Sequence, residues 1–228
     1  MLEKRKPIIG LTMGDPNGIG PEIIIRALTK LNSRLDWHPV IFGDAWVIEQ
    51  VTSKLDSTLQ LKMCENLAEL PDGPCIVDLK VHSGRNWQLG QVSAWGGESS
   101  FHFLKEAIDA ALANQIDAIS TAPLSKKALH MAGYHFPGHT EILSRLSNGA
   151  PPIMMLTVEG MRAVHVSTHV SLLNAIDQIQ PKRILEVAQV TKDALIRMGI
   201  KNPRLALPGL NPHAGEEGLF GDEEKKLL

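Results

Sequence analysis

The sequence is poor in cysteine, in net charge and in long apolar runs, and each shortage excludes a class of protein. Only two cysteines occur among the 228 residues, Cys64 and Cys75, and they do not form a CxxC motif. This usage is typical of a reducing compartment, so we expect a cytoplasmic protein whose thiols have no special role. No apolar run approaches the ~20 residues that span a bilayer. The basic residues at the N-terminus are not followed by the apolar core of a signal peptide.

The charge balance is also nearly even, with a formal net charge of −2 at pH 7. Such a balance argues against broad affinity for nucleic acid or for an anionic membrane. Hydrophobic residues make up 43% of the chain and charged residues 21%, as in ordinary globular proteins. A chain of 228 residues can bury a sizeable core, in one large α/β domain or in two small ones.

Strand-like and helix-like segments alternate along the chain, which favours a mixed α/β sheet. We expect strands at 7–13, 38–43, 75–79, 117–121, 153–158, 161–167 and 204–207, and helices at 21–31, 45–55, 98–113 and 184–198. The strand at 117–121 is expected to be buried. Glu159-Gly160 indicates a hairpin turn and hence one antiparallel insertion. We place a first lobe at 1–136 and part of a second lobe at 137–228.

The segment Gly14-Asp15-Pro16-Asn17-Gly18-Ile19-Gly20-Pro21-Glu22 joins the first expected strand to the first expected helix. Its glycines permit a tight turn and a close backbone approach, and Pro21 suits the first position of a helix. Because the start of a helix attracts anions, this loop could hold an anionic ligand, and Asp15 and Gly18 are candidate contacts of an anion or of the cleft. The spacing is neither GxGxxG nor Walker A, so a purely structural turn is an equally open interpretation.

Two further turns follow the expected strand at 117–121. Thr121-Ala122-Pro123-Leu124-Ser125-Lys126-Lys127 places Lys126 where it can meet a carboxylate or a phosphate, or else lie on a solvated helix face. Pro137-Gly138-His139-Thr140-Glu141 opens another helix, where His139 can donate a hydrogen bond to an anionic or hydroxylated substrate. A surface histidine without a ligand is the alternative.

Two histidines follow strand-like runs later in the chain. His169 ends the segment Val164-His165-Val166-Ser167-Thr168-His169, and His213 lies in a turn after Leu205-Ala206-Leu207. Loops outside the carboxyl ends of strands carry function in open α/β sheets, so both are candidate metal ligands. Catalytic zinc takes three protein ligands and keeps one position open, so two histidines would supply part of a site. The spacing does not show whether the two loops converge.

Four motifs, taken together and in this order, resemble the 4-hydroxythreonine-4-phosphate dehydrogenase (PdxA) family. They are the segments 14–22, 137–141, 167–169 and 211–216. The resemblance runs from Ile8 to the last residue. The segments Ser120-Thr-Ala-Pro-Leu-Ser-Lys-Lys-Ala-Leu-His130 and Gly218-Leu-Phe-Gly-Asp-Glu-Glu224 look closer to the D-threonate/D-erythronate 4-phosphate dehydrogenase branch than to the enzyme of pyridoxine biosynthesis.

The resemblance implies a fold like that of isocitrate and isopropylmalate dehydrogenases, with two lobes around a cleft and homodimers that share their sites. It implies oxidation of a phosphorylated hydroxy acid, transfer of hydride to NAD or NADP, and loss of CO2 from the β-keto acid. By matching positions, His169 and His213 are metal ligands, His139 and Thr140 bind the substrate, and Lys126 is a basic residue of the cleft. No residue is matched to the nicotinamide cofactor.

The metal implied by the resemblance is a divalent ion that acidifies the substrate hydroxyl and stabilises the enolate formed with CO2. Neutral imidazoles suit zinc, cobalt or nickel, whereas magnesium prefers oxygen ligands. We therefore expect zinc, with cobalt, nickel, manganese and magnesium as alternatives.

The sequence also departs from the family pattern. The family continues with a Tyr-His-Asp-Gln-Gly motif that carries a third metal histidine, with ligands of the substrate phosphate and with much of the NAD pocket. The helix that Asp222 would cap has few residues left in this chain. We therefore expect a fold that is incomplete at its C-terminus. The alternative functions are a phosphate acetyltransferase-like enzyme, a dehydrogenase of dihydrodiol carboxylates and a catalytically inactive truncated family member.

Overall fold

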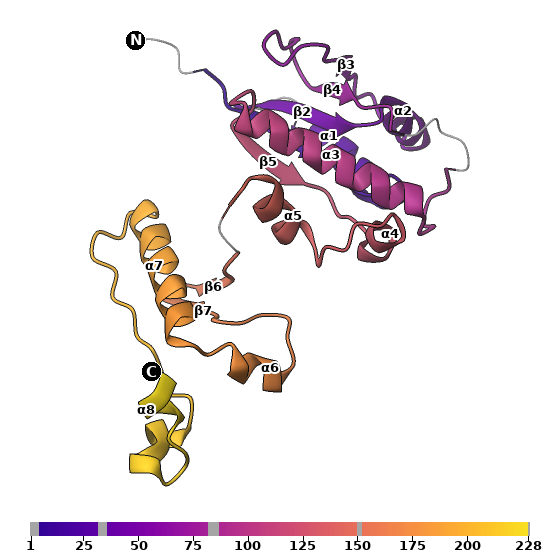
Figure 1. Ribbon diagram of the computed structural model, residues 1–228. Coiled ribbons are helices and arrows are strands. Elements are labelled where there is room, and N and C mark those ends of the chain that lie inside the picture. The colour runs from indigo at the N-terminus through magenta and orange to yellow at the C-terminus, as the bar shows by residue number, and fades with distance from the viewer. Residues whose placement is uncertain (1–4, 32–35, 82–86, 150–151, 228) are drawn as a thin grey trace. The chain divides into compact units, whose positions relative to one another are not determined.

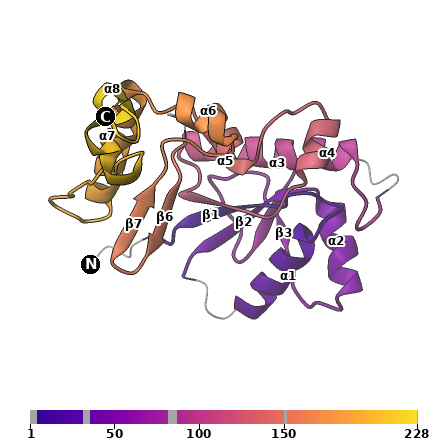
Figure 2. The ribbon, with the colours of Figure 1, turned by 90° about the horizontal axis from the view of Figure 1, so that it is seen from below.

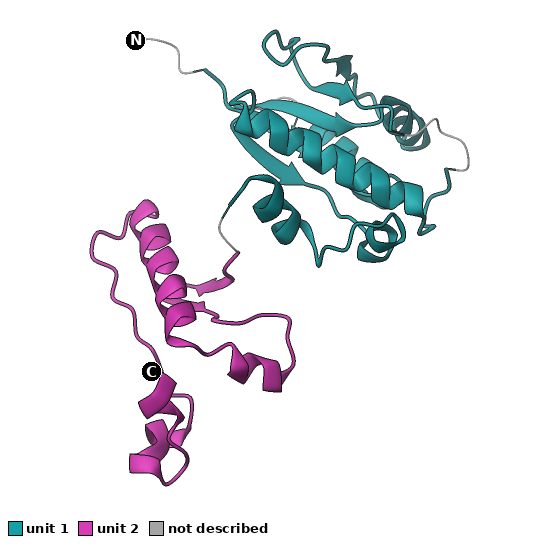
Figure 3. Cartoon of the chain, in the orientation of Figure 1, with its two compact units in different colours: residues 1–151 teal, residues 152–228 magenta. Residues whose placement is uncertain are grey.

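The computed structural model describes residues 5–31, 36–81, 87–149 and 152–227 (Figure 1). The chain divides into two compact units, residues 1–151 and 152–228, which Figure 3 colours separately. The strands of unit 1 are β1 (Ile8–Thr12), β2 (His38–Gly43), β3 (Lys62–Met63), β4 (Cys75–Asp78) and β5 (Ala118–Thr121). Its helices are α1 (Gly20–Leu31), α2 (Ala45–Lys54), α3 (Ala94–Leu112), α4 (Lys126–Met131) and α5 (His139–Leu146).

The strands of unit 1 form one parallel sheet in the order β3-β4-β2-β1-β5. Strand β1 lies between β2 and β5, with Gly10 opposite both Val40 and Ile119. All residues of β2 after His38 are buried, as expected for a parallel strand that is covered on both faces. The sheet confirms the predicted α/β fold class.

Helices α1 and α2 cover one face of the sheet, and α3 covers the other (Figure 2). Ile41 of β2 belongs to one buried cluster with Ile25 of α1 and Val47 of α2. Its neighbour Phe42 belongs to a second cluster with Ala107 of α3. Successive residues of a strand point to opposite faces, so this alternation places β2 between two apolar layers.

Helix α3 packs tightly against α4 because one residue in the contact has no side chain. A Cβ atom on Gly97 would lie 2.1 Å from the carbonyl oxygen of Ala128, so only glycine permits this approach. The buried side chains of Leu104, Leu129 and Ile142 then join α3, α4 and α5 in one cluster. This packing fixes α4 and α5 beside the end of β5.

The order of the strands reverses at β1. From β1 the chain passes through α1 to β2 on one side, whereas β5 on the other side is reached only through α3. Ligands of open α/β sheets bind outside the carboxyl ends of the strands at such a point. The loops that follow β1 and β5 are therefore where this fold favours a ligand.

Unit 2 consists of a hairpin and helices with few buried side chains. Its elements are β6 (Met155–Val158), β7 (Met161–Val164), α6 (Leu172–Asp177), α7 (Pro181–Arg197), the 3-10 segment η1 (Pro212–Gly218) and α8 (Glu223–Leu227). Strands β6 and β7 pair antiparallel, which confirms the hairpin predicted at Glu159-Gly160. Helix α7 buries Val187, Thr191 and Leu195.

Two predictions about strands are wrong for the residues that the structure describes. Residues 204–207 form no strand, because none of the described strands pairs with them and an isolated strand is unstable. Strand β5 lies at the edge of the sheet, with Ala118, Ser120 and Thr121 exposed, whereas a buried strand was expected. The exposed positions arise because β5 has a neighbour on one side only.

The predicted division into lobes at 1–136 and 137–228 remains a prediction. In this structure α5 belongs to unit 1, where Ile142 is fully buried against α3 and α4. The compact units therefore divide at residue 151.

Both cysteines are buried in unit 1 and neither forms a disulfide. Burial raises the pKa of Cys75 to about 12, so this thiol is uncharged at neutral pH. Among the residues described, no helix is long and apolar enough to cross a membrane.

Candidate functional site

The loops that follow β1 and β5 meet at the carboxyl edge of the sheet in unit 1. The backbone N–H of Asp15 donates to the carbonyl of Pro123 at 3.0 Å, and that of Ala122 donates to the carbonyl of Thr12 at 3.0 Å. Within the first loop, the N–H of Gly18 donates to the carbonyl of Asp15 at 2.9 Å. The structure thus brings two of the predicted segments together.

Two glycines make this close approach possible. A Cβ on Gly14, whose φ is +70°, would lie 2.2 Å from the carbonyl oxygen of Pro123. A Cβ on Gly20 would lie 2.1 Å from the carbonyl oxygen of Met13 and 3.1 Å from the Cβ of Ala122. The distances of 2.2 Å and 2.1 Å to carbonyl oxygens are shorter than real Cβ contacts. Gly14 and Gly20 are therefore required for the backbone packing of the site.

His139 is held at the same edge. It is the first residue of α5, and its ring hydrogen-bonds the backbone carbonyl of Ala122 at the end of β5. Burial lowers the pKa of His139, and the hydrogen bond to Ala122 opposes this shift in part. The ring is therefore neutral near pH 7. A neutral imidazole that donates through one nitrogen presents the other as an acceptor.

Lys126 and Glu141 flank the loop that carries His139. A Cβ built on Gly138 would lie 3.6 Å from Oε2 of Glu141 and 3.8 Å from Cε of Lys126. Lys126 is exposed at the start of α4, whose N-cap is Ser125, and Thr140 is exposed in the first turn of α5. A cation, a hydroxyl and a neutral imidazole therefore lie around one turn.

Asp15 adds a buried carboxylate to this edge. The side chain is only 5% exposed, and its Oδ1 accepts the backbone N–H of Asn17 at 2.9 Å. Burial raises the pKa of Asp15, and the hydrogen bond from Asn17 lowers it by less. A carboxylate so placed is more suited to fixing its own loop than to contacting an anion. Gly18 is the more accessible of these two predicted contacts.

His169 and His213 both lie in unit 2 and both are exposed. Each has a left-handed backbone, with φ of 58° at His169 and 53° at His213. His169 follows strand β7 of the hairpin, as expected, whereas the strand expected before His213 at 204–207 does not form. Among the residues that the structure describes, no group of three or more His, Cys, Asp or Glu side chains is placed to hold a metal ion. These residues therefore do not form a complete metal centre.

Comparisons with known proteins identify the family of the chain. The family described as "Pyridoxal phosphate biosynthetic protein PdxA" matches residues 36–228. A protein of Oceanobacillus iheyensis is 41% identical over 230 residues, covering 98% of this chain and 69% of its own length. The D-threonate 4-phosphate dehydrogenase of Salmonella typhimurium is 38% identical over 225 residues, covering 96% of this chain and 68% of its own.

The chain belongs to the PdxA family. The crystal structure of 4-hydroxythreonine-4-phosphate dehydrogenase from Klebsiella pneumoniae aligns with a TM-score of 0.82 and 37% identity, over 97% of this chain and 69% of that one. These relatives are named as dehydrogenases, so the PdxA family to which this chain belongs is a family of dehydrogenases. The structural alignment shows that the chain has the fold of that family.

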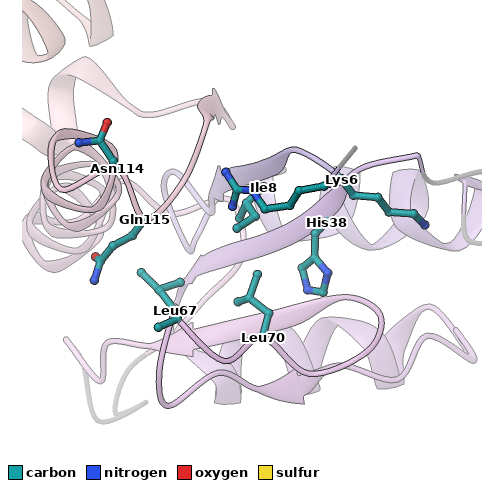
Figure 4. A pocket seen from close by; sticks show the side chains of 9 residues that line it. Lys6, Ile8, His38, Leu67, Leu70, Asn114 and Gln115 are labelled. Atoms are coloured by element: carbon teal, nitrogen blue, oxygen red, sulfur yellow. The ribbon is translucent and has the colours of Figure 1, made fainter. Parts of the chain in front are cut away.

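A hollow of this PdxA family member lies at the opposite, amino edge of the sheet (Figure 4). It has a volume of about 440 Å³ and an apolar wall formed by Ile8, Leu67 and Leu70. Of the charged residues on its wall, Arg5 is paired with Asp117 at 2.8 Å. Burial also lowers the pKa of His38 on its wall. None of the four family motifs contributes a residue to the wall of this hollow. We therefore do not assign it to the binding of the substrate.

The lowered pKa of His139 predicts a pH dependence of stability. Its folded pKa lies below the ordinary 6.5, so the unfolded chain binds a proton first as the pH falls. The stability that neutral His139 provides is complete above pH 6.5 and is lost as the pH falls toward the folded pKa. We expect the free energy of unfolding of the wild type to decrease more than that of His139→Gln between pH 7.5 and pH 5, measured by urea titration. Parallel pH curves for the two proteins would contradict the assignment.

The sequence did not predict which residues hold the loop between β1 and α1 in place. Asn17 Nδ2 donates to Ser93 Oγ at 2.9 Å, and Trp87 Nε1 donates to the carbonyl of Pro16 at 2.9 Å. The one available signal was Ser93, a residue type favoured at helix N-caps. It was overlooked because Gly96 and Gly97 follow it, and glycine disfavours a helix interior.

Proposed function

We propose that this chain acts in the NAD(P)-linked oxidation of a phosphorylated hydroxy acid, with loss of CO2 from the keto acid that is formed. D-threonate or D-erythronate 4-phosphate is the favoured substrate, and phosphorylated 4-hydroxythreonine is the alternative. Identity of 38% to a named D-threonate 4-phosphate dehydrogenase over 96% of this chain supports the proposal. The observation that carries it is the meeting of the Gly14–Gly18 loop, Ala122 and His139 at one edge of the sheet.

The residues of unit 1 would bind and orient the substrate. His139 donates to Ala122, so its other ring nitrogen would accept a hydrogen bond from a substrate hydroxyl. Thr140 would add a neutral donor, and Lys126 would pair with the carboxylate or the phosphate. The start of α1 at Gly20, with Gly18 in the loop just before it, would favour a second anionic group. No residue is assigned to the nicotinamide cofactor, which would accept the hydride.

We also propose His169 and His213 as two ligands of a divalent metal, zinc in the first instance. The described residues do not complete this centre, so we derive no step of the reaction from it. The remaining ligands would come from outside the residues described, either from a longer form of the chain or from a second copy.

Unit 2 supports the further proposal of a homodimer. Leu172 is 86% exposed and Leu173 is 77% exposed, and Leu219 is 73% exposed. Val158 and Met161 at the tip of the hairpin are also exposed. Exposed apolar side chains that gather on one surface are typical of interaction surfaces, and a second copy of the chain would bury these residues. A cytoplasmic location is part of the same proposal.

The test is a spectrophotometric assay of NAD(P) reduction by the 228-residue chain with D-threonate 4-phosphate, across zinc, cobalt, nickel, manganese and magnesium. We expect His139→Ala to lower kcat/KM by roughly 10- to 100-fold, because a hydrogen bond to a charged ligand contributes about 1.5–3 kcal/mol. His130→Ala is the matched control, since His130 is an exposed histidine of the same unit. No turnover with any substrate or metal would contradict activity of this chain by itself. Acetyl-CoA turnover without metal would favour the acyltransferase alternative.

A further inference from the structure

The loop after β1 is gripped by a short segment that none of the family motifs includes. Trp87 Nε1 donates to the carbonyl of Pro16 at 2.9 Å, and the N–H of Gly90 donates to the carbonyl of Asn17 at 2.7 Å. Ser93 Oγ accepts the side-chain N–H of Asn17 at 2.9 Å. Three hydrogen bonds therefore join residues 87–93 to two consecutive loop residues. We call residues 87–93 the brace.

The brace is itself anchored at both ends. At one end, the Trp87 ring contacts Trp46 of α2 edge-on, with centroids 5.6 Å apart, and Lys54 Nζ lies 4.6 Å from its centroid. At the other end, Ser93 is the N-cap of α3, where its Oγ also accepts the N–H of Gly96 at 3.1 Å. A single hydroxyl oxygen thus serves the helix cap and the loop together.

The packing around Ser93 leaves no free space beside the loop. A Cβ built on Gly96 would lie 2.6 Å from Oδ1 of Asp15, 3.2 Å from Oγ of Ser93 and 3.3 Å from Nδ2 of Asn17. Asp15, Asn17 and Gly96 are all buried. The first turn of α3 therefore fixes the position of Asp15 through direct contact as well as through Ser93.

The loop transmits this position to the site. Asp15 N–H donates to the carbonyl of Pro123 at 3.0 Å, and the adjacent Ala122 carbonyl accepts the hydrogen bond of His139. The path from the brace to His139 thus runs through Asn17, Asp15 and the 122–123 backbone, with a contact at each step. Movement of the loop away from α3 would loosen the peptide groups that hold His139.

We propose that Ser93 is a positioning residue of the site, which holds the β1–α1 loop in register with the 122–123 backbone so that His139 is oriented before substrate binds. This inference rests on the proposed function for its substrate. It predicts that amide exchange in the loop and the affinity for substrate change together when the hydroxyl of Ser93 is removed. The hydroxyl is the group that acts, so threonine should replace serine and alanine should not.

The experiment compares Ser93→Ala, Ser93→Thr and Asn17→Ala with the wild type in the 228-residue chain. Amide hydrogen exchange of residues 14–20 reports the loop, and calorimetric titration with D-threonate 4-phosphate reports the site. We expect exchange about tenfold faster and binding about tenfold weaker in Ser93→Ala and Asn17→Ala, since each loses at least one partly buried hydrogen bond. Ser93→Thr should restore both values. In the turnover assay KM should rise more than kcat falls, because orientation in the free protein is what is lost.

Asn17→Ala keeps the cap of α3, so it tests the proposal even if Ser93→Ala unfolds. Asn66→Ala is the matched control, since it removes a side-chain acceptor of the Ala68 N–H at 3.0 Å far from the loop. If amide exchange of residues 14–20 were unchanged in Asn17→Ala, the brace would not hold the loop in place. Faster exchange with unchanged substrate affinity would overturn the positioning role. A wild type that binds no substrate would instead overturn the proposed function, and the positioning role with it, while the exchange data would still show whether the brace holds the loop.

Discussion

Replacing Gly97 with alanine is expected to lower the free energy of unfolding by about 3 kcal/mol, because overpacking of a tight contact costs about 1–3 kcal/mol and sometimes more. The new Cβ would lie 2.1 Å from the Ala128 carbonyl oxygen and 2.6 Å from the Leu129 nitrogen, and these are backbone atoms. They cannot move away without shifting α4. Helix propensity alone predicts the opposite sign, a gain of about 1 kcal/mol for alanine in place of glycine. Urea unfolding followed by circular dichroism measures the difference.

The matched control is Glu98→Ala, at the next position of the same helix. Glu98 is exposed, so its replacement should change the free energy of unfolding by less than about 0.5 kcal/mol. A Gly97→Ala protein as stable as the wild type would mean that α3 and α4 are not held at this distance. The same substitution should also weaken the site, because α4 carries Lys126 and Leu129 anchors α4 to α5.

Gly97 also shows where the sequence stops predicting the structure. The apolar spacing of α3 places its start at Glu98, whereas the helix begins at Ala94. The first turn contains Gly96 and Gly97, which local propensity disfavours, and it forms because Ser93 caps it and because close packing requires small residues. Long-range contacts of this kind leave no periodic signal in the sequence.

The central strands, by contrast, are predictable. Strand β2 has the predicted bounds, and β1 differs from prediction only at its ends, because a run of apolar residues between turn signals has few other solutions. The meeting of the segments 14–18, 122–126 and 138–141 follows from topology, since β1 and β5 are neighbours. The spacing of motifs along the chain does not show which strands are neighbours in the sheet. The motifs lie at one site because β5 pairs with β1. For residues 204–207 the apolar pattern was real, but it had no partner strand.

The two histidines proposed as metal ligands share an unusual backbone conformation. His213 opens a run of six residues, His213–Gly218, with positive φ, and His169 also has positive φ. A left-handed conformation costs a non-glycine residue about 1–2 kcal/mol. Strained residues of this kind cluster at active sites and ligand clamps, where surrounding contacts maintain them. Here Asn211 Nδ2 donates to Glu223 Oε2 at 2.8 Å and closes the turn against α8.

Removing either histidine is therefore expected to lower the affinity of the 228-residue chain for Zn²⁺ or Co²⁺ by roughly 100-fold, because losing even an outer-shell partner of a metal ligand costs 10- to 100-fold. Calorimetric titration at pH 7.5 would compare His169→Ala, His213→Ala and the double variant with the wild type. If the two side chains share one ion, the loss of affinity in the double variant should be smaller than the product of the two single losses, because the effects of coupled ligands are not additive. His130→Ala is the control, since His130 lies in unit 1.

Other patterns of metal binding among the four proteins would distinguish how the loops that carry His169 and His213 are arranged. Loss of metal in one single variant but not in the other would show that the two loops do not converge on one ion. Equal binding by all four proteins would exclude both residues as ligands and would leave their left-handed backbones without a metal role. Because the described residues supply no third ligand, the wild-type affinity itself is informative. Affinity that rises with protein concentration would place the missing ligand on a second copy of the chain, since mass action links binding to association.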